Sequence, residues 1–136
     1  MCRTEAFTLV ELIIVVIIIS VLAAMIIPRF VGRSEDARKE VAMADINVNI
    51  ATALKLYEVD NGVFPNTEEG LKALLKPLSS AKNWKGPYLE KKPLDPWSNP
   101  YNYKCPGVHR PYDYDLFSFG KDGIEGTDDL CNWEED

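Results

Sequence analysis

An unbroken apolar run close to the N-terminus constrains this chain more than any other stretch. The 19 residues from Leu9 to Ile27 contain one charged residue, Glu11, and one hydroxyl group, Ser20. As an α-helix at roughly 1.5 Å per residue, the run spans about 28 Å, close to the roughly 30 Å of a bilayer's hydrocarbon core. Because a carboxylate at membrane depth is costly without a partner, Glu11 is predicted to have a functional role.

Two simpler explanations, a cleaved secretory signal and a plain membrane anchor, each leave features of this run unexplained. A cleaved secretory signal needs a basic start, a shorter apolar run and small residues at the cut site. Here Arg3 is offset by Glu5, and the apolar run is too long for such a signal. A plain single-pass anchor explains the length but gives Glu11 no role.

The stretch Phe7–Glu11, followed by the apolar run, resembles the N-terminus of type IV pilins and of the pseudopilins of type II secretion. The resemblance implies that a prepilin peptidase cuts between Ala6 and Phe7 and methylates the new amine. It also implies that Glu11 meets the amine of a neighbouring subunit's Phe7 when the helices bundle into a filament. Ala6 stands where the family usually has Gly.

The helix is predicted to continue well beyond the apolar run. Pro28 removes a backbone donor and clashes with the preceding turn, so a kink or local unwinding is expected there. Apolar residues then recur at spacings of three and four up to Asn61-Gly62, a typical helix stop. They form two rows, Val41, Ala44, Val48, Ala51 and Leu54, and Ile46, Ile50, Ala53 and Tyr57.

The remaining residues suffice for one small domain. Residues 67–75 are expected to form a short second helix, capped by Asn66 or Thr67. Residues 101–104 and 112–118 alternate with period two, which is typical of strands.

Motifs in this second half narrow the resemblance to the major pseudopilin family of type II secretion. They are Phe64-Pro65, Thr67–Leu71, Gly86–Leu89, Asp95–Trp97, Pro106-Gly107, Asp115-Leu116 with Ser118 and Gly120, Asp122-Gly123, Gly126–Asp129 and Asn132-Trp133. The resemblance implies an α+β, type IV pilin-like fold, in which a long helical spine packs on a small antiparallel sheet with a C-terminal metal-binding loop. It divides the chain into a leader (1–6), a transmembrane and filament-core segment (7–28) and a periplasmic domain (29–136), with the second half of the spine at 29–61.

The C-terminal region is strongly acidic, with nine carboxylates from Asp113 to Asp136 against the single Lys121. The carboxylates of residues 120–129 would repel one another if they lay close together without a cation. Ca²⁺ suits such a setting, because it is coordinated by roughly six to eight hard oxygen atoms. Chemistry alone leaves a calcium site and a solvated acidic turn both open. The resemblance implies a Ca²⁺ ion, in a loop one residue shorter than the family's usual form. Its implied ligands are the side chains of Asp122, Asp128 and Asp129 and the backbone oxygens of Phe119 and Thr127.

Loss of the leader would remove Cys2 and leave Cys105 and Cys131, both in the part expected to face an oxidising compartment. A disulfide between them is predicted, with two buried thiols as the alternative.

Catalysis is not predicted, because the sequence has no nucleophile motif, phosphate-binding glycine loop or zinc-type Cys/His spacing. Asp113 and Asp115 are expected on a turn and a solvent-facing strand edge, which rarely make an acid–base pair. His109 is expected in a solvated surface loop. The net charge of −6 also argues against nucleic acid as a partner.

The favoured hypothesis is a major pseudopilin that polymerises into the periplasmic pseudopilus and drives export by type II secretion. The resemblance implies a single-pass precursor in the bacterial inner membrane, with its globular domain in the periplasm, that is extracted into a helical homo-oligomeric filament. Minor pseudopilins, an inner-membrane assembly platform and the prepilin peptidase are the other implied partners. A type IV pilus subunit for motility or adhesion, and a membrane-tethered calcium-binding module, are the alternatives.

Overall fold

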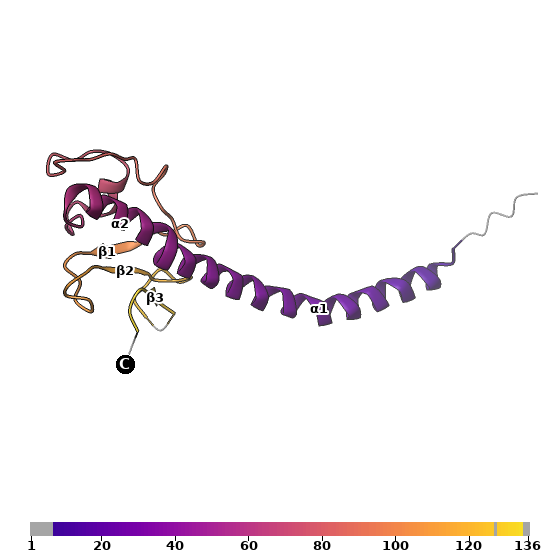
Figure 1. The fold of residues 1–136 in the computed structure, drawn as a ribbon. Helices are drawn as coiled ribbons and strands as arrows, with labels where there is room; N and C mark the ends of the chain where they lie inside the picture. The colour runs from indigo at the N-terminus through magenta and orange to yellow at the C-terminus, as the bar shows by residue number, and fades with distance from the viewer. Residues whose placement is uncertain (1–6, 127, 135–136) are drawn as a thin grey trace, which may run out of the picture. The chain divides into compact units, whose positions relative to one another are not determined.

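The computed structural model describes residues 7–126 and 128–134, and of residues 26–31 the backbone only. The chain forms two units, Met1–Ala37 and Arg38–Asp136. The helical elements are α1 (Leu9–Ala44), the π-helical turn η1 (Asp45–Asn49), α2 (Ile50–Asn61) and the 3-10 turn η2 (Gly70–Leu74). The strands are β1 (Asn102–Lys104), β2 (Asp115–Ser118) and β3 (Leu130–Cys131) (Figure 1). The predicted α+β class is confirmed.

The long helix is capped at both ends. The Thr8 hydroxyl accepts a hydrogen bond from the Glu11 amide at 3.2 Å, the usual pattern of a threonine N-cap. At the other end Gly62 has a φ of 85° and donates its amide to the Glu58 carbonyl at 2.7 Å. The predicted stop at Asn61-Gly62 is confirmed, since glycine adopts this φ without strain.

The π-helical turn η1 lies between α1 and α2, and the sequence did not predict it. Within η1 the Asp45 carboxylate accepts hydrogen bonds from the Tyr101 hydroxyl at 2.9 Å and from the Asn49 side chain at 2.7 Å. Burial, reinforced by the hydrogen bond to Asp45, raises the pKa of Tyr101, so this hydroxyl remains a donor. The turn therefore ties the helix to the residue that precedes β1.

Only one of the two predicted apolar rows is buried as a whole. The buried residues of the helix are Ala42, Ile46, Ile50, Ala53, Leu54 and Tyr57. Val41, Ala44 and Val48 are exposed, so three residues of the other row do not pack on the sheet. A three-stranded sheet covers one side of a helix, and one row of side chains is enough to fill that contact.

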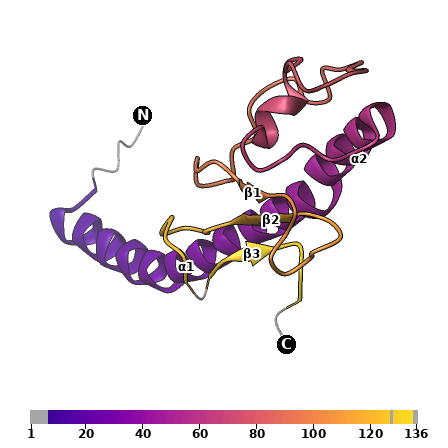
Figure 2. The same cartoon turned by 90° about the vertical axis from the view of Figure 1, so that its left-hand side faces the viewer.

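The sheet is antiparallel in the order β1-β2-β3 (Figure 2). Tyr103 pairs with Leu116, and Phe117 pairs with Cys131. Both predicted strands exist, although the second begins at Asp115 because residues 112–114 belong to the preceding loop. Strand β3 was not predicted, since two residues are too short to show an alternating pattern.

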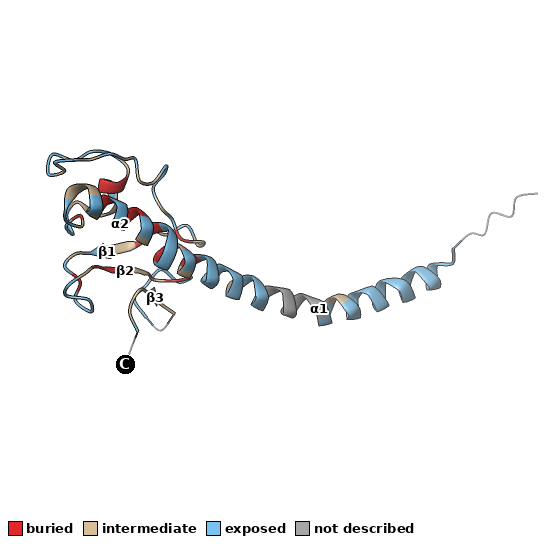
Figure 3. Ribbon diagram, viewed as in Figure 1, coloured by how far each residue is buried: buried red, intermediate tan, exposed pale blue. Residues whose placement is uncertain are grey.

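The core lies between the η1–α2 part of the helix, the sheet and η2 (Figure 3). Its largest fully buried apolar side chains are Ile46, Ile50, Leu54, Leu74 and Leu116. The predicted second helix is the short turn η2. The N-cap of η2 is Glu69, which has no side-chain cap hydrogen bond, so neither predicted cap closes this turn. Asn66 instead orders the residues before η2: its side chain accepts the Glu69 amide at 2.9 Å, and the Glu69 side chain accepts the Asn66 amide at 2.8 Å.

Candidate assembly and metal-binding sites

The N-terminal motif places Phe7 and Glu11 at the start of α1. Phe7 is 82% exposed. The Glu11 amide is held by Thr8, but among the described residues no group pairs with the Glu11 carboxylate. Ala6, on the other side of the predicted cleavage point, lies outside the described residues.

The first half of α1 is apolar and exposed on all sides. Its large apolar side chains, from Phe7 to Met25, are between 44% and 82% exposed. Beyond Glu11, the one polar side chain of this half is Ser20, which donates its hydroxyl to the Val16 carbonyl at 2.7 Å and so needs no outside partner. A helix that is apolar all round requires cover from lipid or from other helices.

A search of the described residues finds no helix of sufficient length and apolarity to cross a membrane. The predicted run ends at Ile26 and Ile27, whose side chains are not described. Pro28 lies within α1, whose backbone stays helical from Leu9 to Ala44, so the expected local unwinding does not occur and the expected kink stays a prediction.

The C-terminal loop connects β2 to β3 and is anchored at its start by a buried carboxylate. Asp95 is 4% exposed and accepts a hydrogen bond from the Ser118 hydroxyl at 2.6 Å. Its other oxygen accepts the amides of Trp97 and Asn99. The Asn99 side chain in turn donates to the Gly120 carbonyl at 3.3 Å. The sequence hinted at this anchor only through Asp95-Pro96, a turn-forming pair.

The three predicted carboxylate ligands are placed differently within this loop. At Gly120, with φ of 68°, an added Cβ would lie 2.7 Å from both the carbonyl and a carboxylate oxygen of Asp128. Asp129 Oδ2 accepts the Gly126 amide at 3.2 Å, while Asp129 Oδ1 is buried and has no hydrogen-bond partner among the residues that the structure describes. Asp122 is exposed and accepts the Ile124 amide at 3.0 Å. Asp128 and Asp129 thus lie at the base of the loop, and Asp122 lies nearer its tip.

This arrangement is compatible with a hard cation but does not form a complete site. No group of three or more acidic, histidine or cysteine residues is assembled to hold a metal within residues 7–126 and 128–134. Thr127, whose backbone oxygen was a predicted ligand, is outside the described residues. The unpartnered oxygen of Asp129 is the feature that a cation would satisfy, since a buried carboxylate oxygen without a partner is costly.

Cys105 and Cys131 are present as separate thiols, and the predicted disulfide is not formed in this structure. Strand β2 lies between β1, which Cys105 follows, and β3, which contains Cys131. Two strand spacings amount to about 10 Å, whereas disulfide-linked Cα atoms lie within about 7 Å.

Asp115 was expected on a solvent-facing edge, yet it is 2% exposed. It accepts hydrogen bonds from the amides of Val108, His109 and Arg110, and from the His109 ring at 3.1 Å. Burial alone would raise the pKa of Asp115, but these donors outweigh it and hold the pKa below its usual value. Asp115 therefore organises the loop before β2.

His109 is 53% exposed, as a surface residue should be, but it is not merely solvated. Its ring stacks on Trp133 with centroids 4.1 Å apart. The neighbouring Arg110 donates to the Asn132 carbonyl at 3.2 Å. These contacts fix the segment after β3 against the β1–β2 loop, and they give His109 a structural role.

A long N-terminal helix, apolar all round in its first half and packed on a small antiparallel sheet in its second, defines a pilin-like subunit. The family described as "Type II secretion system (T2SS), protein G" matches residues 29–133, and the "Prokaryotic N-terminal methylation motif" matches residues 1–27. The chain belongs to the type II secretion system protein G family.

Similar proteins agree along almost the whole chain. The type II secretion system core protein G of Pseudomonas aeruginosa is 44% identical over 140 residues, covering 97% of this chain and 96% of that protein. Its counterpart in Escherichia coli K12 is 42% identical, with 96% and 92% covered. The crystal structure of the major pseudopilin from the type 2 secretion system of enterohaemorrhagic E. coli matches with a TM-score of 0.65 and 33% identity, over 76% of this chain and 92% of that one. These names designate a component of the type II secretion system.

Proposed function

We propose that this chain is a major pseudopilin that polymerises into a periplasmic pseudopilus and drives export by type II secretion. Family membership supports the assignment. The observation that carries it is the apolar first half of α1, whose side chains are exposed on all sides. Packing these helices side by side in a filament would remove that surface from water and lipid at once.

Before assembly, the run Leu9–Ile27 would hold the subunit in the inner membrane with its globular domain in the periplasm. The prepilin peptidase would cut between Ala6 and Phe7 and methylate the new amine. Minor pseudopilins and an inner-membrane platform would complete the assembly machinery. The match to the N-terminal methylation motif supports the processing step.

Glu11 would then pair with the amine of Phe7 in a neighbouring subunit. Its carboxylate has no partner among the described residues, and a charge in an apolar helix bundle is costly until it is paired. The pair would also set the register between subunits, because any other offset leaves both charges unsatisfied.

The first experiment is to determine the intact mass and N-terminal sequence of the membrane-extracted protein. A chain that begins at N-methylated Phe7 is expected. A chain that still begins at Met1 beside an active peptidase would contradict the proposal and favour a tethered, unassembled domain. Long surface filaments that support motility would favour a type IV pilus subunit.

Replacing Glu11 tests assembly itself. Glu11→Leu should still enter the membrane but should lower the amount of sheared filament about tenfold or more, since the inter-subunit charge pair is lost. Glu40→Leu, at an exposed acidic residue of the same helix, is the matched control and should assemble normally. Normal filaments from the Glu11 variant would refute this role.

We further propose that the C-terminal loop binds Ca²⁺ through Asp122, Asp128 and Asp129, with the backbone oxygens of Phe119 and Thr127. The ion would supply a structural cross-link and no catalytic chemistry. The buried, unpartnered Asp129 Oδ1 and the close approach of Asp128 to Gly120 support this assignment.

A further inference from the structure

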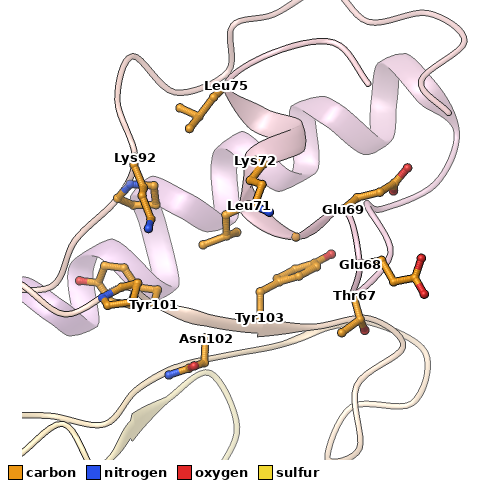
Figure 4. Close-up of a pocket in the computed structure, with 13 residues that line it drawn as sticks. Thr67, Glu68, Glu69, Leu71, Lys72, Leu75, Lys92, Tyr101, Asn102 and Tyr103 are labelled. Atoms are coloured by element: carbon orange, nitrogen blue, oxygen red, sulfur yellow. The ribbon is translucent and has the colours of Figure 1, made fainter. Parts of the chain in front are cut away.

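A pocket of about 380 Å³ lies between η2 and β1, and nothing proposed so far uses it. Leu71 and Leu75 line it from the η2 side, and Tyr103 lines it from β1 (Figure 4). The Tyr103 hydroxyl donates to the Pro65 carbonyl at 2.7 Å, which fixes this wall of the pocket. The pocket is therefore a preformed apolar recess.

The charges around this recess are unevenly distributed. Figure 4 shows Lys92 on one side of the opening and Glu68 and Glu69 on the opposite side, with Lys72 between them on η2. Among the described residues no carboxylate pairs with Lys72 or Lys92. The recess is thus suited to an apolar group that carries a carboxylate on its lysine side.

The loop between β2 and β3 presents such a group at its tip. Ile124 is 67% exposed, and its neighbours Asp122 and Glu125 are exposed as well. The hydrogen bond from the Ile124 amide to Asp122 Oδ1 fixes the turn that presents the side chain. An exposed isoleucine beside two carboxylates matches the recess in both polarity and charge.

We propose that Ile124 of one copy inserts into the η2–β1 recess of a second copy, with Glu125 facing Lys72 and Lys92. The recess lies at the β1 edge of the sheet, whereas the loop leads into β3 at the other edge. The contact is therefore head-to-tail and leaves a free loop and a free recess at the two ends of every pair. A head-to-tail contact whose rotation does not close into a ring repeats as an open helical filament. The inference rests on the proposed filament and specifies a contact within it.

Two other exposed apolar side chains fit the recess less well. Val108 is 62% exposed and Tyr112 is fully exposed, both in the loop between β1 and β2. Val108 is followed by His109 and Arg110, and the carboxylate beside Tyr112, that of Asp113, is already paired with Arg110 at 2.6 Å. Charge complementarity therefore favours Ile124 over these two side chains.

Cysteine cross-linking of the full chain in membranes tests this contact. A variant with both Lys72→Cys and Ile124→Cys should give a ladder of multimers under mild oxidation, because each copy carries both halves of the contact. Each single variant should give no ladder, which also controls for Cys105 and Cys131. The pair Lys76→Cys with Ile124→Cys, with an exposed lysine outside the recess lining, is the matched negative control.

Charge exchange provides a second, independent readout. Lys72→Glu with Lys92→Glu, and separately Glu125→Lys, should each lower the sheared filament about tenfold, and combining them should restore it. Ile124→Ser should have a similar effect, whereas Val108→Ser should have none.

The possible results distinguish failure of this contact from failure of the proposed filament function. Filaments of normal amount from all these variants, with no ladder from the first cysteine pair, would overturn the contact while leaving the proposed function intact. Cross-linking of the recess to a secreted protein instead of a second copy would also overturn it. No filaments and no processing in the unaltered chain would instead refute the proposed function.

Discussion

At the scale of single residues, two buried aspartates accept hydrogen bonds from loop amides, which hydrophobic side chains cannot do. Asp95 and Asp115 are each almost fully buried, and each accepts several hydrogen bonds from backbone amides of a loop. A carboxylate has about four acceptor positions, so one side chain can satisfy several donors of an irregular segment. The turn-rich loops of the domain are therefore held in place by hydrogen bonds from their amides to these two buried carboxylates.

Asp115→Asn should destabilise the domain by about 2 kcal/mol, because the charge-assisted bonds to Val108, His109 and Arg110 are weakened together. The pKa of Asp115 lies below the ordinary 3.8 in the folded protein, so its contribution is complete above that pH. The contribution is lost as the pH falls through the lowered value and the carboxylate protonates.

Thermal unfolding followed by circular dichroism between about pH 6 and about pH 3 measures both effects. The variant should lose less stability on acidification than the unaltered protein does. Asp113→Asn is the matched control, since Asp113 pairs at 2.6 Å with the exposed Arg110 and should contribute less than about 0.5 kcal/mol. Equal acid sensitivity of Asp115→Asn and the unaltered protein would exclude this role.

At the scale of elements, the C-terminal loop depends on how closely its two ends approach each other. Gly120 has a positive φ and also leaves no room for a Cβ beside Asp128. Gly62 has a positive φ as well, but the space around it is open. The two glycines therefore separate backbone strain from steric exclusion.

Gly62→Ala should cost about 1 kcal/mol, the usual penalty for a left-handed alanine. Gly120→Ala should cost at least about 2 kcal/mol, because the loop must also shift away from Asp128. Urea unfolding of both variants measures the difference. Equal costs would mean that the loop relaxes freely and is not held against β2.

At the scale of the whole molecule, one ion is expected to influence the stability of the entire Arg38–Asp136 unit. Calcium bound only by the folded state at about a hundredfold excess over its Kd adds about 2.7 kcal/mol. For a domain of this size, chelation should therefore lower the Tm by roughly 10 °C or more.

Calorimetry with calcium and with a chelator measures this change. Asp129→Asn should abolish the calcium-dependent part, while Glu134→Gln, at an exposed acid outside the predicted ligand set, should retain it. A Tm that is independent of calcium in the unaltered protein would leave the loop as a solvated acidic turn.

The sequence by itself determined the helix, its end at Asn61-Gly62 and the class of the protein. Gly62 acts through a neighbour within four residues, so its role can be read locally, whereas the cap at Thr8 was not predicted. The apolar run from Leu9 to Ile27 likewise needs no tertiary information, because its composition alone defines which surroundings it tolerates. The family followed from motifs of adjacent residues, and the comparisons agree with it.

Only the tertiary structure decided which row of helical side chains is buried and where η1 and β3 lie. It also decided that Asp95 and Asp115 are buried and accept hydrogen bonds from loop amides. It also showed that Cys105 and Cys131 are separated, because strand β2 lies between the strands that carry or precede them. Each of these features depends on residues far apart in the chain, such as Asp45 and Tyr101 or Asp95 and Ser118. Periodicity reports the spacing of apolar residues along the chain, whereas these features depend on what each residue meets across the fold.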